Sequence, residues 1–261
     1  MDFDLAELKT ICKKIRAPGI AEAVEALMSD PAAFDLPPTA WVMSALRNEI
    51  TQREERALTR RLKDARLKHK DASPANIDYS PVRGLKKSAI SNMMSGEWVR
   101  NRLNCVISGK SGVGKTYLAC ALGSSCCRVG LKVKFLRMPL LMDEFKAVAS
   151  LTTGVSKVIR QYDKYDLLIL DDWGYGKLDA SSRKGLMELF EARELSKSVL
   201  ITSILPIKEW AGYIDDPTFS DAIMDRFLGR VIRIEMLGPS IRTPNSQNIA
   251  PGFFHFEKNL S

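Results

Sequence analysis

The stretch "GKSGVGKT", Gly109–Thr116, decides the fold of this 261-residue chain. An apolar run from Leu103 to Ile107 precedes it, and a helical pattern from Lys115 to Val129 follows it. A strand that enters a glycine-rich turn and leaves as a helix turns backbone N–H groups inward around phosphates, at a helix end whose dipole favours negative charge. We therefore expect a nucleotide phosphate site formed by Gly109, Lys110, Ser111, Gly112, Val113, Gly114, Lys115, Thr116 and Tyr117.

Two side chains of this loop add chemistry that the backbone lacks. Lys115 is placed to reach the β- and γ-phosphates, and we predict a catalytic role for it. Thr116 offers a hydroxyl to Mg²⁺, a hard ion that takes oxygen ligands and keeps several waters. ATP and Mg²⁺ are therefore the predicted cofactors.

Two carboxylates follow another apolar run, in the stretch "YDLLILDDWG". A strand from Leu167 to Leu170 would place Asp171 and Asp172 at the carboxyl edge of a sheet, beside the loop. We predict that Asp171 holds Mg²⁺, through water. Asp172 is then predicted to orient or deprotonate the attacking water, a catalytic role that depends on position. The alternative is that both aspartates cap the following turn.

Phosphoryl transfer also needs positive charge on the γ-phosphate in the transition state, and a neighbouring subunit often supplies it. The stretch "FSDAIMDRFLGR" places Arg226 and Arg230 at the end of a late helix. We predict that Arg226 is this catalytic residue and acts in trans. Either arginine could instead make an ordinary ion pair at the helix end.

The rest of the chain separates into a helical part and an alternating part. Apolar residues recur at helical spacing from residue 3 to residue 70, and "DASPANIDYSP" then has the composition of a linker. Beyond it, strands alternate with helices, a pattern typical of a parallel sheet covered on both faces. The expected organisation is an α/β fold with a small all-helical N-terminal domain at 1–70, a linker at 71–100, an ATPase domain at 101–242 and a tail at 243–261.

Composition limits the functional classes without choosing one. Lys and Arg total 39 against 31 Asp and Glu, giving a net charge of +8, which suits a polyanionic partner but does not require one. The basic helical stretch from Arg47 to Lys70 is either a solvated helix face or a surface for phosphate backbones. No apolar run reaches membrane-spanning length, so we expect no membrane partner and a cytoplasmic protein. The five cysteines fall in apolar segments, as reduced buried thiols do.

With these motifs the chain resembles the AAA+ ATPases of the IstB and DnaC group, and most closely the IstB-like helper ATPases of insertion-sequence transposition. The resemblance covers nearly the whole chain up to Arg242. The matching stretches are "IDYSPVRGL", "SGKSGVGKTYLACALG", "DLLILDDWG", "ITSILPIKEW", "DDPTFSDAIMDRF" and "IEMLGPSIR".

This resemblance implies a P-loop AAA+ core whose ATP sites lie at subunit interfaces of a homo-oligomer assembled on double-stranded DNA. It also implies recruitment and stimulation of a cognate DDE-type transposase. Arg242 would be a second sensor that contacts ATP, and the region from Ile77 to Gly84 would line the adenine side. Helices inserted after the second strand would contact DNA, and the basic residues available there are Lys146, Lys157, Arg160 and Lys164.

One position departs from the family pattern. Members usually carry a polar Asn or Gln where this chain has Ile204, at the first sensor of the γ-phosphate. An apolar side chain cannot hydrogen-bond a phosphate or a water. Either Thr202 or Ser203 acts as the sensor, or hydrolysis is slow while ATP binding survives.

Three alternatives to a transposition ATPase stay open. A DnaC-like replicative helicase loader would share every nucleotide-binding residue. A P-loop kinase of small molecules would need an acceptor pocket and a mobile lid that carries arginine. A DNA-binding scaffold that binds ATP without turnover is the third alternative, and Ile204 favours it.

Overall fold

The computed structural model describes residues 4–242 of the chain. Contacts divide the chain into two compact units, Met1–Lys63 and Asp64–Ser261. The predicted boundary after residue 70 and the predicted linker at 71–100 stay predictions. Because the second unit begins at Asp64, it contains both residues 64–70 and residues 71–100. The predicted tail at 243–261 lies outside the described residues.

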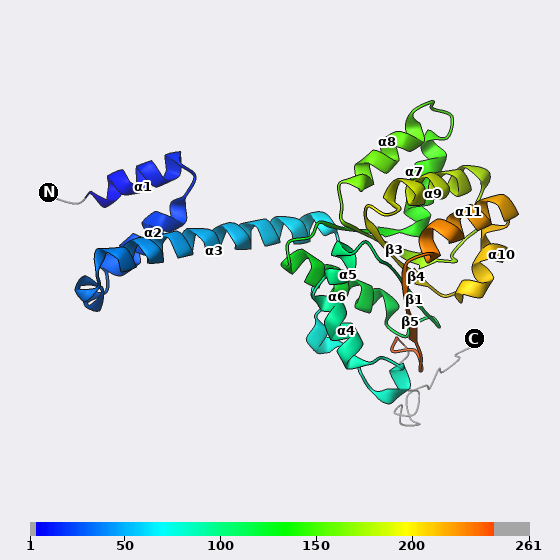
Figure 1. Ribbon diagram of the computed structural model, residues 1–261, viewed down its shortest axis with the longest axis horizontal. Coiled ribbons are helices and arrows are strands. Elements are labelled where there is room, and N and C mark those ends of the chain that lie inside the picture. The colour runs from blue at the N-terminus through cyan, green and yellow to red at the C-terminus, as the bar shows by residue number, and fades with distance from the viewer. Residues whose placement is uncertain (1–3, 243–261) are drawn as a thin grey trace, which may run out of the picture. The chain divides into compact units, whose positions relative to one another are not determined.

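The first unit is entirely helical within its described residues. It contains α1 (Leu5–Lys14), α2 (Pro18–Met28), the short helix η1 (Pro31–Asp35) and most of α3 (Pro38–Ala65) (Figure 1). The Asp4 side chain caps α1 by accepting a hydrogen bond from the N–H of Ala6 at 2.8 Å. This confirms the helical character that was expected from the sequence periodicity.

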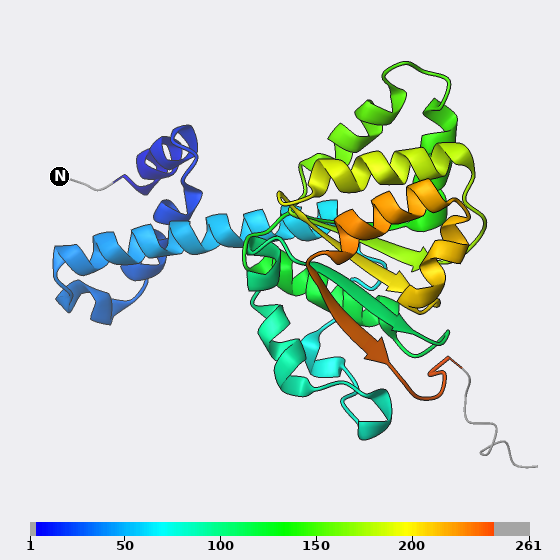
Figure 2. The same cartoon turned by 45° about the vertical axis from the view of Figure 1, so that its right-hand side comes forward.

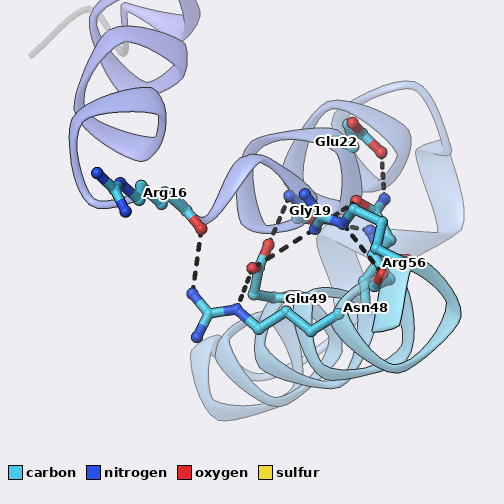
Figure 3. A network of polar contacts seen from close by, with 8 residues as sticks. Arg16, Gly19, Glu22, Asn48, Glu49 and Arg56 are labelled. Carbon is cyan, nitrogen blue, oxygen red and sulfur yellow. Dashed lines mark hydrogen bonds and ion pairs between the residues drawn. The ribbon is translucent and has the colours of Figure 1, made fainter. Parts of the chain in front are cut away.

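A buried polar contact holds α2 against α3 (Figure 3). Glu49 accepts a hydrogen bond from the N–H of Gly19 at 2.8 Å, and Asn48 donates to the carbonyl of Gly19 at 2.7 Å. A Cβ at Gly19 would lie 2.9 Å from the Cα of Glu49, so only glycine allows this approach. Arg53 donates to Glu49 and to the carbonyl of Arg16, which compensates a carboxylate that is only 5% exposed.

The second unit is built on a five-stranded sheet with the order β2-β3-β4-β1-β5. Its strands are β1 (Asn104–Gly109), β2 (Val133–Arg137), β3 (Leu167–Trp173), β4 (Ser198–Ser203) and β5 (Val231–Met236). Every neighbouring pair is parallel. β3 and β4 lie inside the sheet and are almost continuously buried, with the apolar runs Leu167–Leu170 in β3 and Val199–Ile201 in β4. The predicted parallel α/β sheet is confirmed.

Helices cover both faces of this sheet (Figure 2). The helices α4 (Lys87–Met94), α5 (Glu97–Arg100) and α6 (Lys115–Arg128) are associated with one face. The other face carries α7 (Met138–Val148), α8 (Gly154–Asp163), α9 (Ala180–Arg193), α10 (Trp210–Ile214) and α11 (Pro217–Leu228). The unit also contains the short helices η2 (Pro74–Asn76), η3 (Pro81–Arg83) and η4 (Ile207–Glu209).

An aromatic cluster packs at the end of β3, where Asp171 and Asp172 lie. The rings of Trp173 and Trp210 are 4.6 Å apart, and Trp210 stacks on Phe227 of α11 at 5.7 Å. All three side chains are at most 1% exposed. Packing of this density fixes the backbone next to the site.

None of the helices within residues 4–242 combines the length and the apolar character needed to cross a bilayer.

Candidate nucleotide-binding site

The loop between β1 and α6 has a backbone that glycine alone can form. Gly109 and Gly112 have φ angles of +148° and +82°. A Cβ at Gly109 would lie 2.2 Å from the carbonyl oxygen of Met236, and one at Gly112 would lie 2.0 Å from Ser240 Oγ. The N–H of Ile241 donates to the carbonyl of Gly112 at 2.9 Å, so the segment after β5 supports the loop.

Lys115 opens α6 directly behind this loop and is 8% exposed. Its Nζ donates to the carbonyls of Gly109 and Lys110 at 2.7 and 2.8 Å. Burial lowers the pKa of Lys115 below its ordinary value, although the negative charges of Asp171 and Asp172 act in the opposite direction. The ammonium therefore lies inside the loop, where phosphate oxygens would replace the two carbonyls as its partners.

Asp171 lies at the end of β3 and is fully buried. Its Oδ1 accepts hydrogen bonds from the hydroxyls of Thr116, at 2.9 Å, and Thr202. Within residues 4–242, Oδ2 of Asp171 has no hydrogen-bond donor, and its nearest cation is Lys68 Nζ at 3.9 Å. The predicted metal ligands Thr116 and Asp171 are thus adjacent, and among the described residues one buried carboxylate oxygen accepts no hydrogen bond. Oxygen donors with an unsatisfied carboxylate fit Mg²⁺.

Asp172 turns away from its neighbour and lines a cavity. Its φ is +68°, and the pairing of β3 with β4 shifts register between Leu170 and Trp173. The N–H of Asp172 donates to Thr202 Oγ1 at 3.2 Å, and Oδ2 accepts from Arg137 Nε at 2.9 Å. In the described part of the chain, neither carboxylate is hydrogen-bonded to the backbone of the following turn.

Two cavities meet above the loop, and both are lined by Gly114, Tyr117 and Ile241. One, of about 540 Å³, is also lined by Lys68, His69, Ser111, Gly112, Lys115, Thr116, Asp172, Thr202, Ile204 and Arg242. The other, of about 290 Å³, is also lined by Asn76, Ile77, Asp78, Arg83, Val113, Leu118 and Met236. The first offers cations and hydroxyls suited to phosphates. The second is more apolar and contains part of the segment expected beside adenine.

The two candidate sensors differ in where they point. Thr202 lines the larger cavity and bonds Asp171, whereas Ser203 is fully buried and its hydroxyl donates to the carbonyl of Leu205 at 2.7 Å. Ile204 lines the cavity and is 46% exposed. Arg242, the predicted second sensor, lines it too. The structure therefore brings Thr202 and Arg242 to the site and leaves Ser203 outside it.

Arg226 does not line the cavity beside the loop in its own chain. It lies on α11 and is 4.0 Å from the carboxylates of Glu191, on α9, and of Glu194, which follows the end of α9. It also donates to the carbonyl of Ala222 at 3.1 Å. These contacts are the helix-end ion pairs considered above, and a role in catalysis would require a second copy.

The residues predicted to contact DNA divide into two groups. Lys146 on α7 pairs with Asp179 at 3.4 Å. Lys157 and Arg160 are exposed on α8, and Lys164 follows at its end with Nζ 5.1 Å from the ring centre of Tyr165. The last three share one helix face by spacing.

Sequence reasoning missed three polar side chains of the site. Lys68 and His69 line the larger cavity, and Arg137 holds Asp172. Lys68 is one of many basic residues in its stretch, and Arg137 simply ends a strand. No local pattern distinguishes either one.

Known proteins resemble this chain along most of its length. Residues 10–249 match the family described as "IstB-like ATP binding protein". A relative from Sinorhizobium fredii (strain NBRC 101917 / NGR234), named "Putative insertion sequence ATP-binding protein y4pL", is 37% identical over 224 residues, covering 86% of this chain and 91% of the relative.

Solved structures confirm the P-loop AAA+ fold class. A structure described as "Crystal Structure of the DnaI" matches with a TM-score of 0.54 and 19% identity, covering 64% of this chain and 91% of its own. "Crystal structure of the DnaC helicase loader" matches with a TM-score of 0.53 and 16% identity, covering 64% and 97%. Identities this low show a shared fold alone.

Proposed function

The chain belongs to the family of IstB-like ATP-binding proteins, and from this membership we propose that it is an ATPase that assists insertion-sequence transposition. The observation that carries the proposal is the contact between Thr116 of the loop and the buried Asp171, with Asp171 Oδ2 free of hydrogen bonds within residues 4–242. ATP would place its phosphates in the larger cavity and its base in the more apolar one.

Each residue has a chemical task in this proposal. The loop N–H groups and Lys115 bind the β- and γ-phosphates and neutralise charge that builds up during transfer. Thr116 and Asp171 would hold Mg²⁺, which supplies positive charge to the phosphate oxygens when bound. Asp172, whose carboxylate faces the cavity, orients the attacking water. Of the two candidate sensors only Thr202 lines the cavity. Ile204 also lines it and cannot hydrogen-bond a phosphate or a water, which favours slow turnover.

Assembly would complete the site. We place Arg226 of one copy at the nucleotide of the next, because within its own chain it lies outside the cavity. The assembled copies would surround double-stranded DNA, with Lys146, Lys157, Arg160 and Lys164 as phosphate contacts. The net charge of +8 supports an anionic partner. The name of the Sinorhizobium relative refers to an insertion sequence, so a transposase of the same element is the protein partner we propose.

The test is whether ATP controls assembly on DNA. Sedimentation of the chain with a duplex should give large particles with ATP and small particles with ADP, while Lys115→Ala should give small particles with both. The same particles should then retain the transposase encoded beside the gene. Identical profiles with ATP and ADP would contradict the proposal.

The alternative of a replicative helicase loader has the support of fold alone, since the match to the DnaC structure is at 16% identity. Adding a purified replicative helicase to the same sedimentation experiment separates the two functions. Retention of the helicase rather than the transposase would favour the loader.

A further inference from the structure

Lys68 reaches the nucleotide cavity from the segment that follows α3. The helix ends at Ala65, and Arg66 turns the chain with a φ of +51°. Leu67 is only 4% exposed and packs on α6, where its Cδ2 lies 3.1 Å from the position that a Cβ would take at Gly123. The backbone beside Lys68 is therefore fixed by a buried anchor.

The residue on the other side of Lys68 is also held on α6. The ring centre of His69 lies 5.6 Å from that of Tyr117, and Tyr117 Oη accepts a hydrogen bond from the N–H of Ser73 at 3.2 Å. Lys68, His69 and Tyr117 all line the larger cavity. The Lys68 side chain thus starts from a fixed point and extends into the space proposed for the phosphates.

The electrostatic setting of Lys68 is defined by Asp171. A fully buried carboxylate needs compensation, and its Oδ1 has it from two hydroxyls. Lys68 Nζ stands 3.9 Å from Oδ2, while Lys115 Nζ donates to loop carbonyls instead. At 3.9 Å the ammonium balances charge without a hydrogen bond. Its side chain is 41% exposed, so the long stem is free to turn.

We propose that Lys68 is a second phosphate-binding lysine of this site, which neutralises Asp171 before nucleotide binds and contacts the terminal phosphate of ATP afterwards. The inference rests on the proposed ATP site. A divalent cation at Oδ2 of Asp171 would repel the ammonium that now stands beside it. The negative charge of a triphosphate in the same cavity would attract it.

Affinities for ATP and ADP test this directly, because the terminal phosphate is the difference between them. Lys68→Gln should weaken ATP binding about five- to tenfold, the loss expected for one charge-assisted contact, with less than about a twofold change for ADP. Lys68→Arg should retain most of the ATP preference. Lys70→Gln is the matched control, because Lys70 is exposed two residues away and does not line the cavity. Fluorescent ATP and ADP analogues in equilibrium titrations would give all eight affinities.

Manganese binding without nucleotide tests the competition at Asp171. Mn²⁺ is visible by electron paramagnetic resonance and takes oxygen ligands as Mg²⁺ does. Lys68→Gln should bind Mn²⁺ about threefold or more tightly than the unaltered chain, because the competing ammonium is gone. Lys70→Gln should bind Mn²⁺ like the unaltered chain.

The results separate this inference from the ATP site itself. Equal losses for ATP and ADP in Lys68→Gln, or no loss for either, would overturn the role of Lys68, as would unchanged Mn²⁺ binding. If Lys115→Ala abolishes ATP binding while Lys68→Gln does not alter the ATP preference, only the Lys68 inference fails. If Lys115→Ala retains tight ATP binding, the proposed ATP site is refuted, and the role of Lys68 is refuted with it. Thermal melting of each variant reports folding, and Lys68→Arg keeps the charge if Lys68→Gln is less stable.

Discussion

Arg137, the last residue of β2, donates a hydrogen bond from Nε to Oδ2 of Asp172 across 2.9 Å. Asp172 faces the nucleotide cavity, whereas Arg137 lines a separate cavity of about 530 Å³ at the edge of the sheet. The cavity beside Arg137 is also lined by Arg66, Lys134 and Lys164. The ion pair therefore joins the proposed water-orienting carboxylate to a residue that lines a second charged cavity.

Breaking this pair should change basal turnover. Arg137→Gln releases one oxygen of Asp172, and we expect hydrolysis without DNA to rise about two- to fivefold, the range set by a half-exposed ion pair. Steady-state phosphate release measures it, with Arg128→Gln, an exposed arginine of α6, as the control. A fall in turnover as large as that of an Asp172 variant would show that Arg137 instead holds the carboxylate in its working position.

Asp172 itself should matter for hydrolysis and not for binding. Asp172→Asn keeps the size of the side chain but loses the charge that orients water, so turnover should fall by about 10²-fold or more. ATP affinity should stay within about threefold, since the amide still fits the cavity. Comparison of phosphate release with equilibrium ATP titration checks both. Unchanged turnover would remove Asp172 from the mechanism.

Lys115 should be required for binding. Lys115→Ala removes a charge that lies inside the loop, and we expect ATP affinity to fall by about 10²-fold. Lys87→Ala, an exposed lysine of α4, is a control with the same change in charge. Both variants should melt near the temperature of the unaltered chain. Tight ATP binding by Lys115→Ala would refute the assignment of the loop.

Arg226 should act between copies. Arg226→Ala and Asp172→Asn are each expected to hydrolyse ATP slowly, but mixed assemblies contain some interfaces with an intact Asp172 and an intact Arg226. Those interfaces should recover part of the lost activity. The measurement is phosphate release from mixtures whose co-assembly is verified by sedimentation. No recovery in verified mixtures would leave Arg226 with its ion pairs to Glu191 and Glu194 alone.

The first unit offers a pH-dependent test at Glu49. Burial raises the pKa of Glu49, but hydrogen bonds from Arg53 and Gly19 and the charges of Arg53 and Arg56 lower it below its ordinary value of 4.5 overall. Because the folded pKa of Glu49 lies below the unfolded one, the charged carboxylate stabilises the folded state fully above about pH 4.5. This stabilisation is lost as the pH falls through the lower folded pKa.

Amide exchange at Gly19 reads this contact locally, because its N–H donates to Glu49. Glu49→Gln should speed exchange of this amide near neutral pH, where Glu49 is charged, and the difference from the unaltered chain should shrink as the pH falls through the lowered folded pKa of Glu49. Glu54→Gln, an exposed residue of the same helix, should leave it unchanged. A difference that persists undiminished at low pH would show that charge is not the cause.

The sequence by itself determined the loop, the strand that enters it and the helix that leaves it. These features are local, because glycines at Gly109, Gly112 and Gly114 specify the turn and the next residues specify the helix. The apolar run before Asp171 likewise predicted a buried strand with carboxylates at its end, and the alternation of strands and helices predicted the parallel sheet.

Only the tertiary structure decided which side chains meet. The order β2-β3-β4-β1-β5 places β4 between β3 and β1, so Thr202 of β4 bonds Asp171 of β3, while Thr116, 55 residues away along the chain, reaches the same oxygen. Lys68 lies at the site because its neighbour Leu67 is buried, and Arg137 lies there because β2 pairs with β3. Such contacts depend on how separate apolar faces pack together, and no pattern within a single segment records that choice.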